Sequence, residues 1–166
     1  QIPDALYREI VDFELPAPGE YATGIAFLPR DALDAASVES SIASLAEEEG
    51  LEIVGWRDLP VDNSMIGSVA MAAEPTFRQV FIASCDTGNG RLSGLDLDRH
   101  AYMLRKRTEH EIKLNRGTTP AGGVGTVGTG HDGAYFASLS SRTIVYKGML
   151  TTTQLAEFFP DLTDPR

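Results

Sequence analysis

The amino-acid sequence predicts an α+β fold with the element order βαββαβ followed by βα. Three observations support this prediction. Short runs rich in β-branched and aromatic residues are bounded by glycine and proline, as strands are. Two longer runs carry apolar residues at helical spacing. The first six elements follow the order of a split βαβ pair of the ferredoxin type. Because the sequence contains no internal repeat, we treat residues 1–166 as one domain.

The first strand is predicted at residues 21–28, where apolar side chains lie between proline breakers. A helix follows, with Asp31 as its N-cap and Gly50 as its C-terminal stop. Its apolar stripe has near-helical spacing and contains Leu33, Val38, Ile42 and Leu45. The acidic run that ends this helix, residues 47–49, is interpreted as a solvated face.

The second and third strands are predicted at residues 51–59 and 76–83, which are rich in β-branched and aromatic residues. A second helix is predicted from Asp96 to about Asn115, because its apolar residues line one face and its acidic residues precede its basic ones. The apolar face contains Leu97, Ala101, Leu104 and Ile112. The basic cluster of Arg105, Lys106, Arg107 and Lys113 is interpreted as a solvated helix end rather than an anion site.

The last third of the chain begins with a glycine-rich segment, residues 115–133, which we predict to be a flexible loop because it has no apolar periodicity. Two short strands are predicted at residues 134–139 and 143–146. A final helix starts at Thr151, which forms a capping box with Gln154, and ends before Pro160.

Composition and charge exclude several classes of function. The formal net charge of −10 disfavours nucleic acid and anionic lipid surfaces as partners. No apolar stretch reaches membrane-spanning length, and the first residues do not resemble a secretory signal. The single cysteine, Cys85, forms no internal disulfide, which favours a cytoplasmic location. A first residue of Gln rather than Met favours a chain cut from a longer one.

Two motifs fall in the glycine-rich segment. Residues 123–128 match the G-x-G-x-x-G pattern of dinucleotide sites, but no predicted strand precedes them and no helix follows, so a plain loop is favoured. His131 and Asp132 are adjacent in the same segment, while His100 and His110 lie on the charged helix. We interpret all three histidines as surface residues, and no metal site is predicted.

No residue is assigned a catalytic or cofactor-binding role from its chemistry. Cys85 is the only thiol, but Asp86 beside it disfavours a thiolate, so a structural or incidental cysteine is the favoured interpretation. Two polar-aromatic clusters, residues 56–58 and 146–149, stand at predicted strand ends, where loops often contribute to sites. Structural corners have the same composition, so both interpretations of these clusters stay open.

Five strings carry a resemblance to a known family. They are Gly19–Arg30, Glu49–Val61, Arg78–Phe81, Ser138–Leu150 and Phe159–Arg166. In this order they resemble the large subunit of bacterial glutamate synthases, and the string Ser-Ser-Arg-Thr-Ile-Val-Tyr-Lys-Gly-Met within the fourth is the most specific. The resemblance covers nearly the whole chain outside residues 85–94 and the glycine-rich segment.

The resemblance implies an Ntn-type αββα glutamine amidotransferase domain of class II, which hydrolyses glutamine to supply ammonia for glutamate synthesis from 2-oxoglutarate. The nucleophile of that family is a cysteine at the mature N-terminus, whereas residue 1 here is Gln. Residues 1–166 are therefore expected to be a partial domain, an interior scaffold that is inactive by itself. For the intact parent the resemblance implies FMN and an iron–sulfur cluster, held by other domains.

The strand-turn region of the most specific string is expected to contact the remaining domains of the parent subunit. Its candidate contact residues are Arg142, Tyr146, Lys147, Gly148 and Met149. Two are cations in an acidic chain and two are apolar neighbours suited to an interface, so self-association of the chain is also expected. The alternative function is a free-standing, non-catalytic binding or regulatory module that shares the scaffold.

Overall fold

A four-stranded antiparallel sheet forms the centre of the protein in a computed structural model that describes residues 2–86, 88, 90–116 and 134–164. Its strands are β1 (Tyr21–Leu28), β2 (Leu51–Asp58), β3 (Thr76–Ser84) and β4 (Tyr135–Phe136). The order across the sheet is β2-β3-β1-β4, so β3 lies between β1 and β2 while β1 lies between β3 and β4. This is the predicted pair of split βαβ units, and the α+β class is confirmed.

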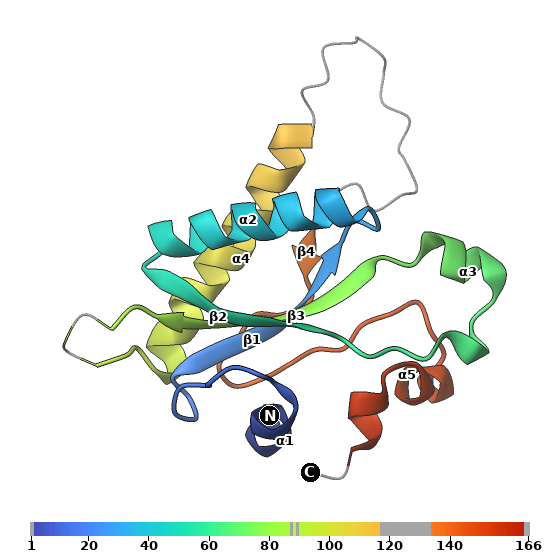
Figure 1. The fold of residues 1–166 in the computed structure, drawn as a ribbon, viewed down its shortest axis with the longest axis horizontal. Coiled ribbons are helices and arrows are strands. Elements are labelled where there is room, and N and C mark those ends of the chain that lie inside the picture. Colours follow the sequence, from blue (N-terminus) through green and yellow to red (C-terminus); the bar gives the residue numbers. More distant parts are fainter. Residues whose placement is uncertain (1, 87, 89, 117–133, 165–166) are drawn as a thin grey trace.

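Five α-helices and two short 3-10 helices accompany the sheet in the described part of the chain (Figure 1). The α-helices are α1 (Asp4–Ile10), α2 (Ala32–Glu48), α3 (Ser68–Ala73), α4 (Gly94–Arg116) and α5 (Thr152–Phe158). The 3-10 helices are η1 (Asn63–Met65) and η2 (Pro160–Thr163). For residues 113–116 of α4 the description covers the backbone.

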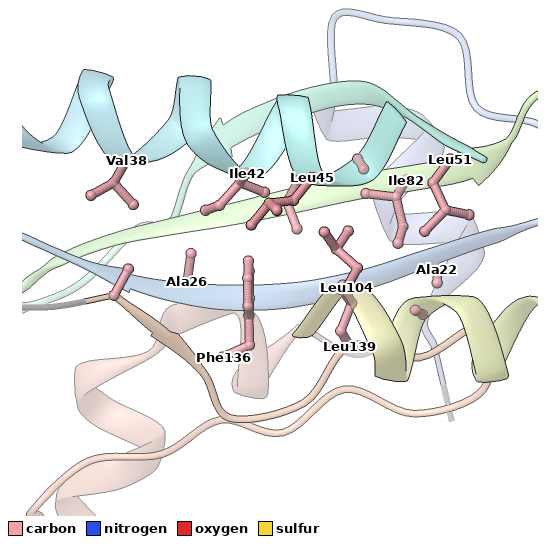
Figure 2. Packing of buried hydrophobic residues seen from close by; sticks show 14 of the residues in the cluster. Ala22, Ala26, Val38, Ile42, Leu45, Leu51, Ile82, Leu104, Phe136 and Leu139 are labelled. Atoms are coloured by element: carbon pink, nitrogen blue, oxygen red, sulfur yellow. The ribbon is translucent and has the colours of Figure 1, made fainter. Parts of the chain in front are cut away.

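Helices α2 and α4 cover one face of the sheet and enclose the main core. Figure 2 shows Val38, Ile42 and Leu45 of α2 directed toward the strands. Leu104 of α4 reaches the same core, where β1 contributes the small residues Ala22 and Ala26. Small residues on the central strand allow both helices to approach the sheet closely.

The opposite face of the sheet is covered by α1 and by the C-terminal segment with α5 and η2. One apolar cluster joins Leu6 and Tyr7 of α1 to Phe81 of β3. A second joins Phe27 of β1 to Phe158, the last residue of α5, and to Phe159, which directly precedes η2. All eight residues of β1 are buried, because the strand is covered on both faces.

A glycine in β1 allows the chain after β4 to cross the strand. A Cβ atom built on Gly24 would lie 2.1 Å from the carbonyl oxygen of Ser138, which is part of the backbone. Next to it, the amide of Thr23 donates to the carbonyl of Ser140, and the amide of Ser140 donates to the carbonyl of Thr23. Only a residue without a side chain fits at this crossing.

The start and end signals of α2 are confirmed. The Asp31 side chain accepts hydrogen bonds from the amides of Leu33 and Asp34 at 2.9 and 3.0 Å, and Gly50 has a φ of +71°. The predicted stripe was wrong at Leu33, which is 83% exposed. Val38 is five positions further along the helix, which places the two side chains about 140° apart around the helix axis. They therefore face different directions.

The capping box of the last helix is also confirmed. The amide of Gln154 donates to Thr151 Oγ1, and the amide of Thr151 donates to Gln154 Oε1. The helix ends at Phe158, before Pro160, as predicted.

The predicted strand at residues 143–146 is wrong, since these residues join no ladder. Their amides bond to serine side chains instead: Thr143 donates to Ser140 Oγ and Val145 donates to Ser138 Oγ. The serine hydroxyls accept the backbone amide hydrogens that would otherwise bond to a neighbouring strand. The strand predicted at residues 134–139 is likewise reduced to the two residues of β4.

Four helical elements had no sequence prediction: α1, α3 and the two 3-10 helices η1 and η2. Helix α4 begins two residues earlier than predicted, at Gly94, and continues through Arg116. The first two residues of the predicted loop at 115–133 thus belong to the α4 backbone, and residues 117–133 lie outside the described residues. Among the described residues no helix is long and apolar enough to cross a membrane.

Candidate functional site

The face of the sheet that carries α1 and η2 buries a connected set of polar side chains. At its centre is Arg57 of β2, which donates to both carboxylate oxygens of Asp161 at 2.7 and 2.9 Å. The other guanidinium nitrogen donates to Gln79 Oε1 at 2.9 Å. The Arg57 and Asp161 side chains are 12% and 8% exposed, so this ion pair is largely removed from water. Both bonds to Asp161 start from one nitrogen, Nη2, and charge-assisted hydrogen bonds of this kind are stronger than bonds between neutral groups.

The network continues across the strands from this ion pair. Gln79 Nε2 donates to Thr23 Oγ1 at 3.0 Å, and the Thr23 hydroxyl donates to the carbonyl of Val80 at 2.7 Å. On the other side, the Tyr146 hydroxyl donates to Asp161 Oδ2 at 2.9 Å. We call Thr23, Arg57, Gln79, Tyr146 and Asp161 the buried polar network. It ties three strands to two segments near the C-terminal end of the chain.

Two tyrosines in this region are held in their neutral form. Burial raises the pKa of Tyr146, and the adjacent charge of Asp161 acts in the same direction. Burial also raises the pKa of Tyr7, whose ring is fully buried beside Gln79 and Tyr146. The Tyr7 hydroxyl forms no hydrogen bond of normal geometry within the described residues, although it lies next to those two side chains.

The two polar-aromatic clusters seen in the sequence meet in this network. Arg57 from the first cluster and Tyr146 from the second both bind Asp161, which the sequence analysis did not single out. The flanking residues of the first cluster face the other way. Trp56 lies under the Arg78 guanidinium, 5.6 Å from its carbon to the ring centre, and Asp58 pairs with Arg78 at 2.9 Å.

The five candidate contact residues have different environments. Tyr146 is half-buried in the network, whereas Gly148 is exposed and Met149 is fully exposed. Lys147 is exposed and places its ammonium 5.2 Å from the ring centre of Tyr135. Arg142 donates from Nε to Asp98 Oδ2 at 2.8 Å. The contact itself stays a prediction.

Asp98 fixes the turn that carries Arg142. Burial alone would raise its pKa, but hydrogen bonds from the Ser141 amide, Arg142 and Ser140 outweigh burial, and the pKa of Asp98 is lowered. The Ser141 amide donates to Asp98 Oδ1 at 2.6 Å. Asp98 is therefore an ionised anchor between α4 and the segment after β4.

A shallow pocket of about 380 Å³ lies beside this turn. It is lined by Ile2, Asp4, Pro18, Gly19, Tyr21, Ser141 and Arg142. Asp4 accepts hydrogen bonds from Tyr21 and Arg8, both at 2.9 Å. The two charged groups of the lining, the carboxylate of Asp4 and the guanidinium of Arg142, therefore both have partners within the chain.

The remaining candidate residues from the sequence form no common site among the described residues. Cys85 is exposed, and no hydrogen bond to its thiol occurs among the described residues. His100 and His110 are exposed on α4, as predicted. Within the same described ranges, no group of three His, Cys, Asp or Glu side chains is placed to hold a metal ion. Residues 123–128, His131 and Asp132 lie outside the described residues.

The three residues of the basic cluster whose side chains the structure describes are paired with acids. Arg105 and Lys106 both bind Glu109, at 3.2 and 2.8 Å. Arg107 reaches across to Glu48 and Glu49 at the end of α2, and these carboxylates raise its pKa. The acidic run of α2 is thus more than the solvated face that we predicted, because it joins α2 to α4.

Comparisons with known proteins identify a family and relatives that cover most or all of the chain. A family model for class-II glutamine amidotransferases matches residues 1–166. The glutamate synthase [NADPH] large chain of Bacillus subtilis is 39% identical over 165 residues, which cover 99% of this chain and 10% of the relative. The ferredoxin-dependent glutamate synthase, chloroplastic, of Oryza sativa subsp. japonica is 36% identical over 139 residues, 84% of this chain and 8% of the relative.

A third relative, the glutamate synthase [NADH] of Schizosaccharomyces pombe, is 33% identical over 150 residues, 89% of this chain and 6% of the relative. The chain therefore spans a tenth or less of the length of these curated relatives. The resemblance predicted from the five strings is confirmed.

Proposed function

The chain belongs to the class-II glutamine amidotransferases, and from this premise we propose that it is the scaffold portion of the glutaminase domain of a glutamate synthase. In the intact protein this domain releases ammonia from glutamine for the synthesis of glutamate from 2-oxoglutarate. The observation that carries the proposal is the 39% identity to a glutamate synthase large chain over 99% of these residues.

The buried polar network gives this scaffold role a physical basis. Burying an ion pair rarely adds net stability, since desolvation offsets the attraction between the charges, but its geometry favours one arrangement of the chain. Here the pair between Arg57 and Asp161 holds η2 against the sheet, and Tyr146 holds the preceding segment to the same carboxylate. We propose that the network fixes the direction in which the domain continues toward its reaction centre.

We propose that the catalytic groups of the glutaminase reaction lie outside residues 1–166. Class-II chemistry needs a nucleophile, a base and oxyanion donors within reach of one amide carbon. Cys85 is the one thiol of the chain, and its exposed side chain stands apart from the buried polar network. We therefore propose that residues 1–166 alone do not hydrolyse glutamine.

The cofactors of the intact protein are assigned to its other domains. An iron–sulfur cluster is held by several cysteine thiolates, and this chain has one cysteine. Its residues therefore do not fit a cluster. The FMN implied by the family resemblance is likewise proposed to bind elsewhere in the parent protein.

The strand-turn region is proposed to contact the remaining domains of the parent. Fully exposed Met149 and exposed Lys147 support this role. Tyr146 and Arg142 act from within, because each is bonded to a carboxylate of this chain and holds the region in place. Self-association of the isolated chain is the competing outcome, and a cytoplasmic location stays a prediction.

Ammonia release from glutamine tests the proposed function. The 166-residue chain is expected to give the background rate, and a full-length glutamate synthase that carries this sequence is expected to be active. Cys85→Ser is the matched control and should leave both results unchanged. Glutamine hydrolysis by the 166-residue chain that disappears in Cys85→Ser would contradict the proposed inactivity. A full-length protein that is folded but does not hydrolyse glutamine would favour the non-catalytic module.

A further inference from the structure

The segment around α3 is apolar and exposed. From Asn63 to Ala73 the sequence contains no charged residue, in a chain where 23% of residues are charged. Helix α3 buries none of its six residues, and Val69 is 84% exposed. A helix without charges is normally buried, because water solvates its apolar side chains poorly. Its exposure here indicates a surface that another structure covers.

Two side chains from the rest of the protein nevertheless donate hydrogen bonds to backbone carbonyls of this segment. The Arg30 guanidinium donates to the carbonyl of Ala72, and Gln154 Nε2 donates to the carbonyl of Met65 at 3.2 Å. Asn63 Nδ2 donates to Glu74 Oε2 at 3.0 Å, which closes the segment at both ends. The apolar side chains are thus presented on an anchored backbone.

A second exposed apolar residue, Met149, lies in the segment before α5. Ile66, next to Met65, and Leu150, next to Met149, pack against the same apolar cluster as α5. In Figure 1, α3 lies beyond the ends of β2 and β3, on the side of the molecule where α5 and the segment before it are found. We call Met65, Val69, Met71 and Met149 the methionine face. Methionine suits a contact surface because its unbranched, polarisable side chain adapts to a partner.

We propose that the methionine face is an interface covered by a part of the same polypeptide outside residues 1–166, and this inference rests on the proposed function. The relatives carry the matching residues within chains at least ten times longer, so most of their polypeptide lies outside this region. Permanent interfaces are more apolar than transient ones and resemble the two halves of a protein core. The methionine face has this apolar composition. A second copy fits less well, since two copies with a net charge of −10 each repel one another.

Oxidation of methionine by hydrogen peroxide tests the interface in a full-length glutamate synthase that carries this sequence. The chain has four methionines, three on the methionine face and Met103 on α4. Met103 is 48% exposed, between Met65 at 57% and Met71 at 38%, so it serves as an internal control. Mass spectrometry gives the rate of sulfoxide formation at each position, relative to the rate in the urea-unfolded protein.

We expect Met65, Met71 and Met149 to be oxidised roughly tenfold more slowly than Met103, because a covered thioether reacts only when the interface opens. Val69→Asp should raise the three rates toward that of Met103, whereas Leu95→Asp, at an exposed apolar residue of α4, should not. Equal rates at all four methionines would overturn the inference. Protection that disappears on dilution to a monomer would also overturn it, in favour of a second copy.

The glutaminase assay of the same protein separates this inference from the proposed function. Protected methionines in a protein without glutaminase activity would leave the interface standing and reject the function. An active protein with unprotected methionines would support the proposed function and reject the interface.

Discussion

The buried polar network and the methionine face lie in the same 166-residue chain and are opposites in composition and environment. In the network, charged and polar side chains are removed from water and have partners from distant parts of the chain. In the methionine face, apolar side chains are left in water on an anchored backbone. One region places polar groups where a core is expected, and the other places core residues where a surface is expected.

The difference shows which parts of the domain are complete within these residues. A buried charge is tolerated only when it is paired, so a network with satisfied hydrogen bonds indicates that its partners are all present. Exposed apolar side chains have no such requirement, but they lose the stabilisation that burial gives. The network thus links segments within these residues, whereas the methionine face has no cover within them.

Removal of one partner of the buried ion pair should have the largest effect on stability. Asp161→Ala leaves Arg57 charged and unpaired in a position with little access to water, so the free energy of unfolding should fall by about 3–5 kcal/mol. Urea unfolding followed by circular dichroism measures the change. The double variant Arg57→Met with Asp161→Leu is the control, because it removes both charges and should lose much less. A loss below about 1 kcal/mol for Asp161→Ala would mean that the ion pair is open to solvent.

A side chain at the β1 crossing should have the next largest effect. Gly24→Ala places a Cβ 2.1 Å from the Ser138 carbonyl oxygen, and a backbone atom cannot rotate away, so a loss of about 1–3 kcal/mol is expected. Gly67→Ala is the matched control, because no atom lies within 4 Å of a Cβ at that position beside α3. Equal stability of the two variants would contradict the close packing of residue 138 on β1.

Loss of the capping box should have a smaller effect, since it concerns one helix end near the methionine face. Thr151→Ala removes the acceptor for the Gln154 amide, and a loss of about 1 kcal/mol is expected from thermal or urea unfolding. Thr151→Ser keeps a hydroxyl and should retain most of the stability. If both variants were equally destabilised, the effect would come from the methyl group and not from the cap.

The smallest effect is expected on the methionine face itself. Met149→Ser changes a fully exposed side chain, so the free energy of unfolding of the 166-residue chain should change by less than about 0.5 kcal/mol. The same substitution should reduce any self-association seen by light scattering. A large loss of stability would show that Met149 is buried within one copy, which would remove it from the proposed interface.

Local signals account for the elements that the sequence predicted correctly. Asp31 before α2 and Thr151 before α5 are caps whose chemistry acts over three residues, and strands β1, β2 and β3 carry breakers at their ends. The strand predicted at residues 143–146 was wrong because Ser138 and Ser140 supply side-chain acceptors that a propensity pattern does not contain.

The network was beyond local reasoning for a different reason. Arg57 and Asp161 are 104 residues apart, and they meet only because the Arg57 side chain lies on the face of the sheet that η2 covers. The sequence marked Arg57 and Tyr146 as polar-aromatic positions but gave no sign of their common partner. Helix α3 was missed because its uncharged residues, which include three alanines, show no amphipathic period.

Amide hydrogen exchange of the monomeric 166-residue chain tests the contrast between the two regions most directly. Peptides from β1 and β3 should exchange slowly, because these strands are covered on both faces, and the peptide of residues 63–74 should exchange rapidly, because α3 has no cover. Mass spectrometry resolves both in one experiment. Protection of residues 63–74 equal to that of β1 and β3 would contradict the claim that the methionine face lacks a partner within this chain.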